Sequence, residues 1–313
     1  MKIVAIEPLG VEENLLRSIA KQRLKEEHEL VIYKDRASSS EELIARGIGA
    51  EAIIVANQPL PAEVIASLPS LKMLSVAFTG VDHIPLPACR EQGITVSNCA
   101  GYSTAAVADL VFGLLLSLYR RIPACNEAVR KEGTKDGLVG FELEGKKFGV
   151  VGAGAIGMRV AQIAAAFGCE VYAYSRTQKE LTGVKFVSLD ELLCSCDIIS
   201  LHTPLNEQTR GLIGKAQLSQ MKMNAVLINT ARGPIVDSEA LAEALREGRI
   251  AGAGIDVFEA EPPIAANHPL LQAPNLLATP HVAFATKEAL VKRAHIAFEN
   301  IAAYLRGQPQ NLV

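Results

Sequence analysis

Three polar residues that could carry out chemistry each follow an apolar run of the sequence. Arg232 follows AVLINT, Glu261 lies just after GIDVF, and His281 follows NLLATP. If these runs are strands of one parallel sheet, their carboxyl ends share an edge of that sheet. We therefore expect the three side chains to meet there, although dozens of residues separate them in the chain.

The three residue types together suit hydride transfer to a 2-oxoacid. Arg232 can bind a substrate carboxylate through two parallel hydrogen bonds and polarise the adjacent carbonyl group. His281 can donate a proton to the carbonyl oxygen as hydride arrives, and take it back in the reverse direction. Glu261 can hold the imidazole in one orientation and favour its protonated form. Taken singly, the same residues also fit a loop salt bridge, a core or cap histidine and a solvated carboxylate.

A glycine-rich segment upstream is typical of a dinucleotide site. Gly152, Gly154 and Gly157 have G-x-G-x-x-G spacing, with an apolar strand pattern before them and a helical pattern from Ala155 onward. Gly152 would permit the tight turn, Gly154 the approach of the pyrophosphate, and Gly157 the close packing of helix on strand. The phosphates would bind the free N–H groups of the helix N-terminus. The alternative is a strand–turn–helix with incidental glycines.

The strand after this loop ends without the acid that usually binds the ribose of NAD. Residues 171–177 read VYAYSRT, so Ser175 and Arg176 stand at the strand end, 18 and 19 residues past Gly157. A neutral serine would not repel the 2′-phosphate of NADP, and Arg176 offers that phosphate a planar cationic fork. Thr177 and Lys179 add a hydroxyl and a charge. The sequence thus favours NADP(H) over NAD(H), and a solvated Arg176 with loose cofactor preference is the alternative.

Two further strand ends supply candidate cofactor contacts. Asp256, at the end of AGAGID, could accept a hydrogen bond from the nicotinamide carboxamide. Thr230, the last residue of AVLINT, lies at the same predicted edge.

Two series of alternating strand and helix patterns must position these residues. The first series comprises the strand-like runs 2–6, 29–33, 52–56, 72–78 and 94–98; the second comprises 148–152, 170–175, 197–202, 225–230, 251–258 and 275–280. Such alternation predicts parallel sheets covered on both faces. A long helix is expected from Ser103-Thr104 to about Arg121, then a connection over 131–147. The last helical pattern, 285–307, is expected to pack back on the first series.

The predicted fold class is therefore α/β, with two doubly wound parallel-sheet domains. A Rossmann cofactor domain, residues 101–284, would be inserted in a discontinuous flavodoxin-like substrate domain formed by residues 1–100 and 285–313.

Composition excludes several other classes of protein. Hydrophobic residues make up 49% of the chain and charged residues 21%, with a net charge of −3 and a pI near 6.1, so no nucleic-acid partner is indicated. No apolar run reaches membrane-spanning length, and the N-terminus lacks a signal-peptide pattern. The six cysteines are scattered without a CxxC pair, so we expect small buried hydrophobes in a reducing cytoplasm and no metal site.

The ordered motifs of the chain resemble the D-2-hydroxyacid dehydrogenase family. LEGKKFGVVGAGAIG, SLHTPLNEQTRGLI, LINTARGPIVDSEAL, GAGIDVFEAEPP and TPHVAF occur in the family's order and cover nearly the whole chain. The resemblance implies that Arg232, Glu261 and His281 are catalytic, with Glu259 a bystander. It also implies that Thr203, Asp256 and Ile156 contact the cofactor. In the first domain, VAFTGVDHI resembles the loop that holds the substrate carboxylate, which makes Phe78, Thr79 and Gly80 candidates.

The resemblance carries further expectations about substrate and assembly. The family includes reductases of glyoxylate and hydroxypyruvate, and its members are typically homodimers; Tyr102 and Phe78 are expected to line the substrate pocket. Phosphoglycerate dehydrogenases usually place an Arg after the third strand, where this chain has Ala56, Asn57 and Gln58, so that substrate is disfavoured. A dinucleotide-sensing corepressor on the same fold remains an alternative. Formate dehydrogenation usually pairs with Gln at the position of Glu261 and is also disfavoured.

Overall fold

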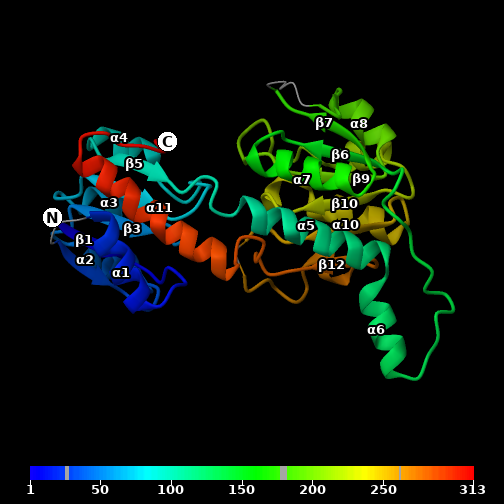
Figure 1. Cartoon of the computed structure of the whole chain (residues 1–313), viewed down its shortest axis with the longest axis horizontal. Helices are drawn as coiled ribbons and strands as arrows, with labels where there is room; N and C mark the ends of the chain where they lie inside the picture. The colour runs from blue at the N-terminus through cyan, green and yellow to red at the C-terminus, as the bar shows by residue number, and fades with distance from the viewer. Residues whose placement is uncertain (25–27, 177–181, 261) are drawn as a thin grey trace. The chain divides into compact units, whose positions relative to one another are not determined.

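The computed structural model divides into two compact α/β units (Figure 1). It describes residues 1–24, 28–176, 182–260 and 262–313. Unit 1 comprises Met1–Ser103 and Ala285–Val313, and unit 2 comprises Thr104–Phe284. Each unit has one parallel sheet, which confirms the predicted fold class.

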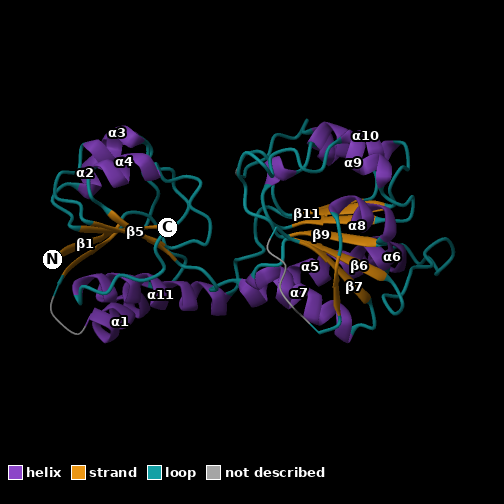
Figure 2. Ribbon diagram, turned by 90° about the horizontal axis from the view of Figure 1, so that it is seen from above, coloured by secondary structure: helices purple, strands orange, loops and turns teal. Residues whose placement is uncertain are grey.

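Unit 1 is built on a five-stranded sheet with helices on both faces. Its strands run in the order β2-β1-β3-β4-β5 and are all parallel. The strands are β1 (Lys2–Ala5), β2 (Glu29–Ile32), β3 (Ala52–Val55), β4 (Met73–Val76) and β5 (Thr95–Asn98). One face carries α2 (Ser40–Gly47), α3 (Ala62–Ala66) and α4 (Leu86–Glu91); the other carries α1 (Glu13–Leu24) and α11 (Lys287–Leu305) (Figure 2). This is the flavodoxin-like strand order, in which ligands bind beyond the carboxyl ends of the strands.

The last helix of the chain, α11, packs on β4 and β5 of unit 1. Ser75 in β4 is fully buried and donates its hydroxyl to the Ala297 carbonyl at 3.0 Å. Asn300 is also fully buried, and its side-chain amide donates to the Asn98 carbonyl at the end of β5. These contacts explain why the C-terminal segment belongs to the unit formed by the start of the chain.

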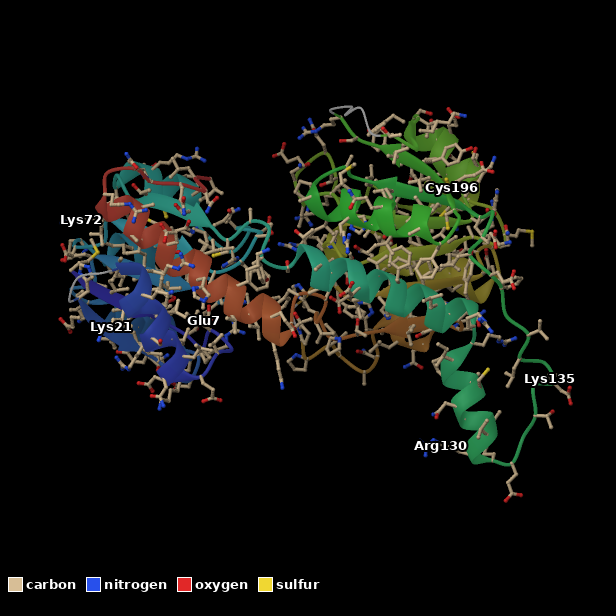
Figure 3. The ribbon with its side chains drawn as sticks, viewed as in Figure 1. Glu7, Lys21, Lys72, Arg130, Lys135 and Cys196 are labelled. Atoms are coloured by element: carbon tan, nitrogen blue, oxygen red, sulfur yellow. The ribbon has the colours of Figure 1, made fainter. Side chains whose placement is uncertain are left out.

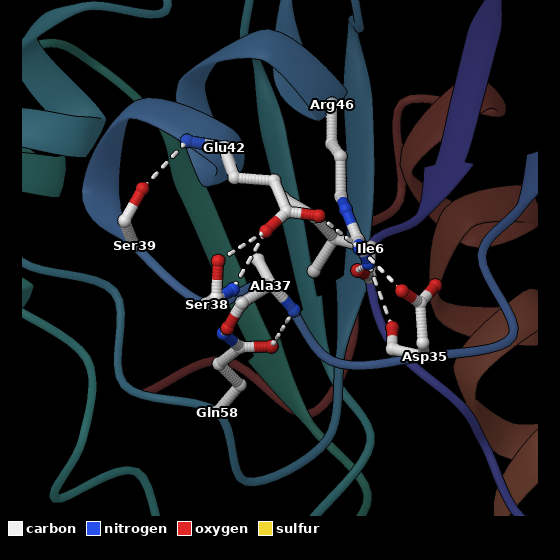
Figure 4. Close-up of polar contacts among 8 residues, drawn as sticks. All are labelled: Ile6, Asp35, Ala37, Ser38, Ser39, Glu42, Arg46 and Gln58. Atoms are coloured by element: carbon white, nitrogen blue, oxygen red, sulfur yellow. Dashed lines mark hydrogen bonds and ion pairs between the residues drawn. The ribbon is translucent and has the colours of Figure 1, made fainter.

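A polar network fixes the loop that follows β2 (Figure 4). The buried Arg46 guanidinium donates to the Ile6 and Asp35 carbonyls at 3.1 and 2.7 Å, and pairs with the Asp35 carboxylate. Gln58, from the loop after β3, exchanges two hydrogen bonds with the Ala37 backbone. The loops at the carboxyl edge of this sheet are therefore held to one another by side chains.

Unit 2 has a seven-stranded parallel sheet in the order β12-β11-β10-β9-β6-β7-β8. Its strands are β6 (Lys147–Val151), β7 (Glu170–Tyr174), β8 (Val184–Phe186), β9 (Ile198–Leu201), β10 (Val226–Asn229), β11 (Gly252–Ile255) and β12 (Leu276–Ala278). One face is covered by α5 (Thr104–Tyr119) and α7 (Ala155–Ala166); the other by α8 (Leu189–Ser195), α9 (Lys215–Gln220) and α10 (Ser238–Arg246) (Figure 2). Short 3-10 helices lie at Gly233–Ile235 and Pro269–Gln272. The strand order reverses between β6 and β9, so this is the switch point where a dinucleotide is expected.

Two elements of unit 2 differ from the sequence prediction. The three-residue strand β8 has the sequence VKF, which contains no continuous apolar run, and it was not expected. The helix predicted to reach Arg121 ends at Tyr119, because Arg121 adopts a left-handed conformation with φ 51°. A second helix, α6 (Ile122–Arg130), then begins with Pro123 in its first turn, where the missing N–H costs nothing.

The arm formed by α6 and residues 131–142 extends from unit 2 (Figure 3). Among the described residues of α6 none is buried. Ile122, Val129, Val139 and Phe141 are between 50% and 79% exposed. Across the ranges that the structure describes, no helix has the length and apolar character needed to cross a bilayer.

Candidate active site

The glycine loop of unit 2 is built by close backbone contacts. Gly152 has φ 104°, and a Cβ there would lie 2.7 Å from the carbonyl carbon and oxygen of His202. A Cβ at Gly157 would lie 2.0 Å from the Gly152 oxygen, so only glycine allows the helix to approach the turn. At Gly154, the N-cap of α7, a Cβ would meet no described atom within 4 Å. Open space at the helix N-terminus is what a pyrophosphate requires.

Two buried threonine hydroxyls at the carboxyl edge of the unit 2 sheet have no hydrogen-bond partner among the described residues. Thr203 follows β9, which flanks the switch point, and Thr230 follows β10, the next strand along the sheet. Neither Oγ1 atom has a hydrogen-bond partner among the described residues. Buried hydroxyls without a partner are costly, so a polar ligand at this edge would satisfy them. Together with the glycine loop, they fit a bound dinucleotide.

The strand end predicted to select the cofactor is accessible. Ser175 is partly buried and Arg176 is exposed, directly after β7. Arg176 Nη1 donates to Gln208 Oε1 at 3.0 Å. Thr177 and Lys179 lie outside the described residues. No aspartate or glutamate stands at either described position of this strand end.

The loop that carries Arg232 is shaped by two neighbours that the sequence did not single out. Asn229 accepts from the Ala231 N–H at 3.0 Å and donates to the Arg232 carbonyl at 2.9 Å. A Cβ at Gly233 would lie 2.0 Å from the Phe258 carbonyl, so the loop presses against the backbone that leads out of β11. An asparagine at the end of a strand, in the sequence NTARG, was the available signal for this turn. The Arg232 loop and the 256–260 segment are therefore brought together by backbone packing.

Asp256 organises the turn that carries His281. Its carboxylate is fully buried and accepts from the Thr279 hydroxyl at 2.6 Å and from the Val282 and Ala283 N–H groups at 2.9 Å each. The His281 N–H donates to the Asp256 carbonyl at 2.8 Å. Burial raises the pKa of Asp256, and the hydrogen bond from Thr279 opposes that change.

His281 itself has a backbone conformation that is costly for a non-glycine residue. Its φ is 55°, in the left-handed region. The ring is only partly buried and packs edge-to-face on Phe284, with centroids 5.4 Å apart. A strained residue held by a buried carboxylate at the carboxyl edge of a sheet is typical of functional sites.

Glu261, the third predicted catalytic residue, lies outside the described residues. The neighbouring acid Glu259 is described, and its carboxylate contacts His268 Nε2 at 3.0 Å. Glu259 is thus engaged by His268, a different histidine from the catalytic candidate.

The predicted substrate residues of unit 1 gather at the carboxyl end of β4. Phe78 and Tyr102 are 7% and 4% exposed, and their ring centroids lie 6.1 Å apart. The Arg293 guanidinium of α11 lies 5.8 and 5.7 Å from these two rings. Burial raises the pKa of Tyr102 to about 12, so its hydroxyl stays protonated. Thr79 is exposed, Gly80 is partly buried, and the Asn98 side chain donates to the Thr79 carbonyl.

In residues 1–24, 28–176, 182–260 and 262–313, no cluster of three or more His, Cys, Asp or Glu side chains could hold a metal ion. Cys194 is exposed, whereas Cys196 is buried and its pKa is raised to about 12 by that burial.

The family model for the NAD-binding domain of D-isomer-specific 2-hydroxyacid dehydrogenases matches residues 112–283. The chain belongs to this family. It is an NAD(P)-dependent oxidoreductase that acts on the CH–OH group of 2-hydroxyacids.

Individual relatives of this dehydrogenase cover nearly its full length. A glyoxylate reductase of Korarchaeum cryptofilum is 38% identical over 93% of this chain and 91% of its own. The acyclic imino acid reductase Bsp5, solved with NADPH and D-Arg, is 33% identical over 100% of both chains with a TM-score of 0.92. A D-lactate dehydrogenase of Aquifex aeolicus, solved with NAD and lactic acid, is 31% identical over 98% of this chain and 96% of its own, with a TM-score of 0.84.

Proposed function

We propose that this dehydrogenase reduces a small 2-oxoacid to the D-2-hydroxyacid, with NADPH as the preferred cofactor and Arg232, Glu261 and His281 as the catalytic residues. The observation that carries the proposal is the turn held by Asp256. That turn carries His281, whose backbone has a φ of 55°, and it belongs to the same sheet edge as the Arg232 loop and two threonine hydroxyls without a partner among the described residues, which supports the proposal.

Arg232 and His281 have complementary tasks in this reaction. Arg232 binds the substrate carboxylate and polarises the carbonyl group next to it. The protonated His281 imidazole gives its proton to the carbonyl oxygen and becomes neutral, while Glu261 favours the protonated ring before transfer. When bound, the reduced nicotinamide supplies the hydride to the carbonyl carbon. In the reverse direction His281 accepts the hydroxyl proton.

Unit 2 is proposed to hold the cofactor. Gly152, Gly154, Ala155, Ile156 and Gly157 would bind the pyrophosphate, while Thr203 and Thr230 would bind the nicotinamide side. The predicted contact between Asp256 and the nicotinamide carboxamide is not part of this proposal, because its carboxylate is fully buried and both oxygens accept from the 279–283 turn. Ser175 and Arg176 would bind the adenosine ribose. Because no described carboxylate stands at this strand end, the 2′-phosphate meets a cation rather than an anion. Solved relatives hold NADPH in one case and NAD in another, so the preference rests on these two residues.

Unit 1 is proposed to be the substrate domain. Its substrate contacts would be the loop around Phe78, Thr79 and Gly80 together with Tyr102, whose ring packs on Phe78. We also propose that the enzyme is a homodimer. The apolar side chains of the arm are 50–79% exposed, which is costly in water, and a second copy of the chain would cover them.

We further propose that the enzyme works in the cytoplasm, because its six cysteines are free thiols, as expected in a reducing compartment.

The test is kinetic and uses the purified enzyme with both cofactors. We expect kcat/KM to be higher for glyoxylate, hydroxypyruvate or pyruvate than for 3-phosphohydroxypyruvate, and about 10- to 100-fold higher with NADPH than with NADH. His281→Asn should retain cofactor binding and lose about 10²- to 10⁴-fold in kcat, which is the usual contribution of a general acid. A parent enzyme that prefers NADH would contradict the cofactor assignment. Near-normal turnover of His281→Asn, with chemistry rate-limiting, would contradict its role as proton donor.

A further inference from the structure

Arg176 is held by a side chain from a different loop of unit 2. Its Nη1 donates to Gln208 Oε1 at 3.0 Å, and the two residues are 32 positions apart in the chain. A guanidinium has only donors, so the carboxamide oxygen of Gln208 must face it. The orientation of the Gln208 carboxamide in this contact is therefore fixed, with its oxygen toward Arg176.

The backbone around Gln208 is fixed by its own turn. The Asn206 side chain accepts from the Gln208 N–H at 2.9 Å and from the Thr209 N–H at 3.1 Å. The Thr209 hydroxyl donates to the Pro204 carbonyl at 2.6 Å and accepts from the Asn206 N–H at 2.9 Å. These bonds make the loop after β9 a rigid support, although Gln208 itself is exposed.

From these contacts we propose that Gln208 determines cofactor specificity by positioning the Arg176 guanidinium for the 2′-phosphate of NADP(H). This inference rests on the proposed preference for NADPH. A free arginine side chain loses rotamer entropy when it binds a phosphate, and prior anchoring removes part of that cost. Gln208 thus acts through Arg176 and is a positioning residue.

The choice of a neutral anchor has a physical reason. Glutamine holds the guanidinium without neutralising its charge, so the fork remains fully available to an anion. A glutamate at the same position would hold Arg176 more firmly, but it would place a negative charge beside the 2′-phosphate. The two side chains have nearly the same shape, so their comparison separates charge from geometry.

The test measures binding of two adenosine probes to the full-length protein by isothermal titration calorimetry. 2′,5′-ADP carries the 2′-phosphate and 5′-AMP lacks it. We expect Gln208→Ala to weaken the binding of 2′,5′-ADP about 2- to 10-fold, the cost of immobilising one long side chain, and to leave the binding of 5′-AMP within about 2-fold. Gln208→Glu should weaken the binding of 2′,5′-ADP more than Gln208→Ala does, because the glutamate adds a negative charge beside the 2′-phosphate. Gln162→Ala, which truncates an exposed glutamine of α7, is the matched control and should change neither probe.

A double-mutant cycle shows whether Gln208 acts through Arg176. In an Arg176→Ala background, Gln208→Ala should have no further effect on 2′,5′-ADP. If Gln208→Ala weakens 2′,5′-ADP equally in the parent and Arg176→Ala backgrounds, or weakens both probes equally, the inference is overturned. The proposed cofactor would still stand in that case, provided that the parent binds 2′,5′-ADP more tightly than 5′-AMP. A parent that binds 5′-AMP as tightly as 2′,5′-ADP would overturn the proposed NADPH preference and this inference with it. Matching thermal unfolding midpoints establish that each variant is folded.

Discussion

Replacement of Asp256 by Asn tests whether a buried carboxylate positions the proposed proton donor. Oδ1 of Asp256 accepts from the Thr279 hydroxyl and the Val282 N–H, and Oδ2 accepts from the Ala283 N–H. Asparagine keeps one oxygen and replaces the other by an NH₂ group. If the oxygen takes the place of Oδ1, the NH₂ group faces the Ala283 N–H, and two donors oppose each other.

The expected loss of stability follows from this single mismatch. A buried N–H group left without an acceptor costs about 1–3 kcal/mol. Because burial raises the pKa of Asp256, removal of its charge recovers part of that cost, and about 1–2 kcal/mol remains. For a domain of about 150–250 residues this lowers the unfolding midpoint by about 2–8 °C. The turn at His281, strained at φ 55°, would relax, and a displacement near 1 Å would lower kcat about 10- to 100-fold.

A matched control is available in the same unit. Asp197 is also largely buried and accepts from a backbone N–H, that of Lys147, and from Lys222 at 2.9 Å each, but it lies at the opposite edge of the sheet. Asp197→Asn should lower stability and leave the kcat of the folded enzyme unchanged. Thermal unfolding and saturating kinetics at a temperature well below both midpoints separate the two effects. If Asp256→Asn loses stability and keeps full kcat, as the control does, then Asp256 does not position His281.

Three further predictions concern other parts of the molecule. Arg232→Lys keeps the charge but loses the planar guanidinium, so we expect a raised KM for the oxoacid together with a lowered kcat. Unchanged kinetics would show that Arg232 does not bind the substrate. Burial alone would raise the pKa of Asp197, but the hydrogen bonds from Lys147 and Lys222 outweigh burial and lower it. The ionised Asp197 therefore contributes stability at pH values above its ordinary pKa of 3.8, and this contribution is lost as the pH falls through its lower folded-state pKa. In urea titrations, the free energies of unfolding of the parent and Asp197→Asn should differ at pH 7 and become equal in acid. Val129→Glu places a charge on the exposed apolar arm and should convert a dimer into monomers in sedimentation velocity, whereas an unchanged sedimentation coefficient would show that the arm is not the interface.

The α/β architecture could be predicted from the chain because local signals agree with one another. Strands such as AIIV in β3 and VLIN in β10 are buried on all sides, and fully buried parallel strands read as continuous apolar runs. Elements without such a signal were missed. β8 is short and only partly buried, and α6 has an apolar stripe with no buried residue to mark it as a separate helix.

The sequence by itself determined which residue types stand at the carboxyl ends of the strands, because strand ends follow from the apolar pattern and parallel strands share an edge. Glycine spacing likewise indicated a turn that could hold a pyrophosphate. Only the tertiary structure decided how the strand-end side chains are held. Contacts between Asp256 and the 279–283 turn, between Gly233 and Phe258, and between Arg176 and Gln208 join segments that are distant in the chain. No local pattern encodes such pairs, since each depends on strand order and on the backbone approach that the sheet imposes.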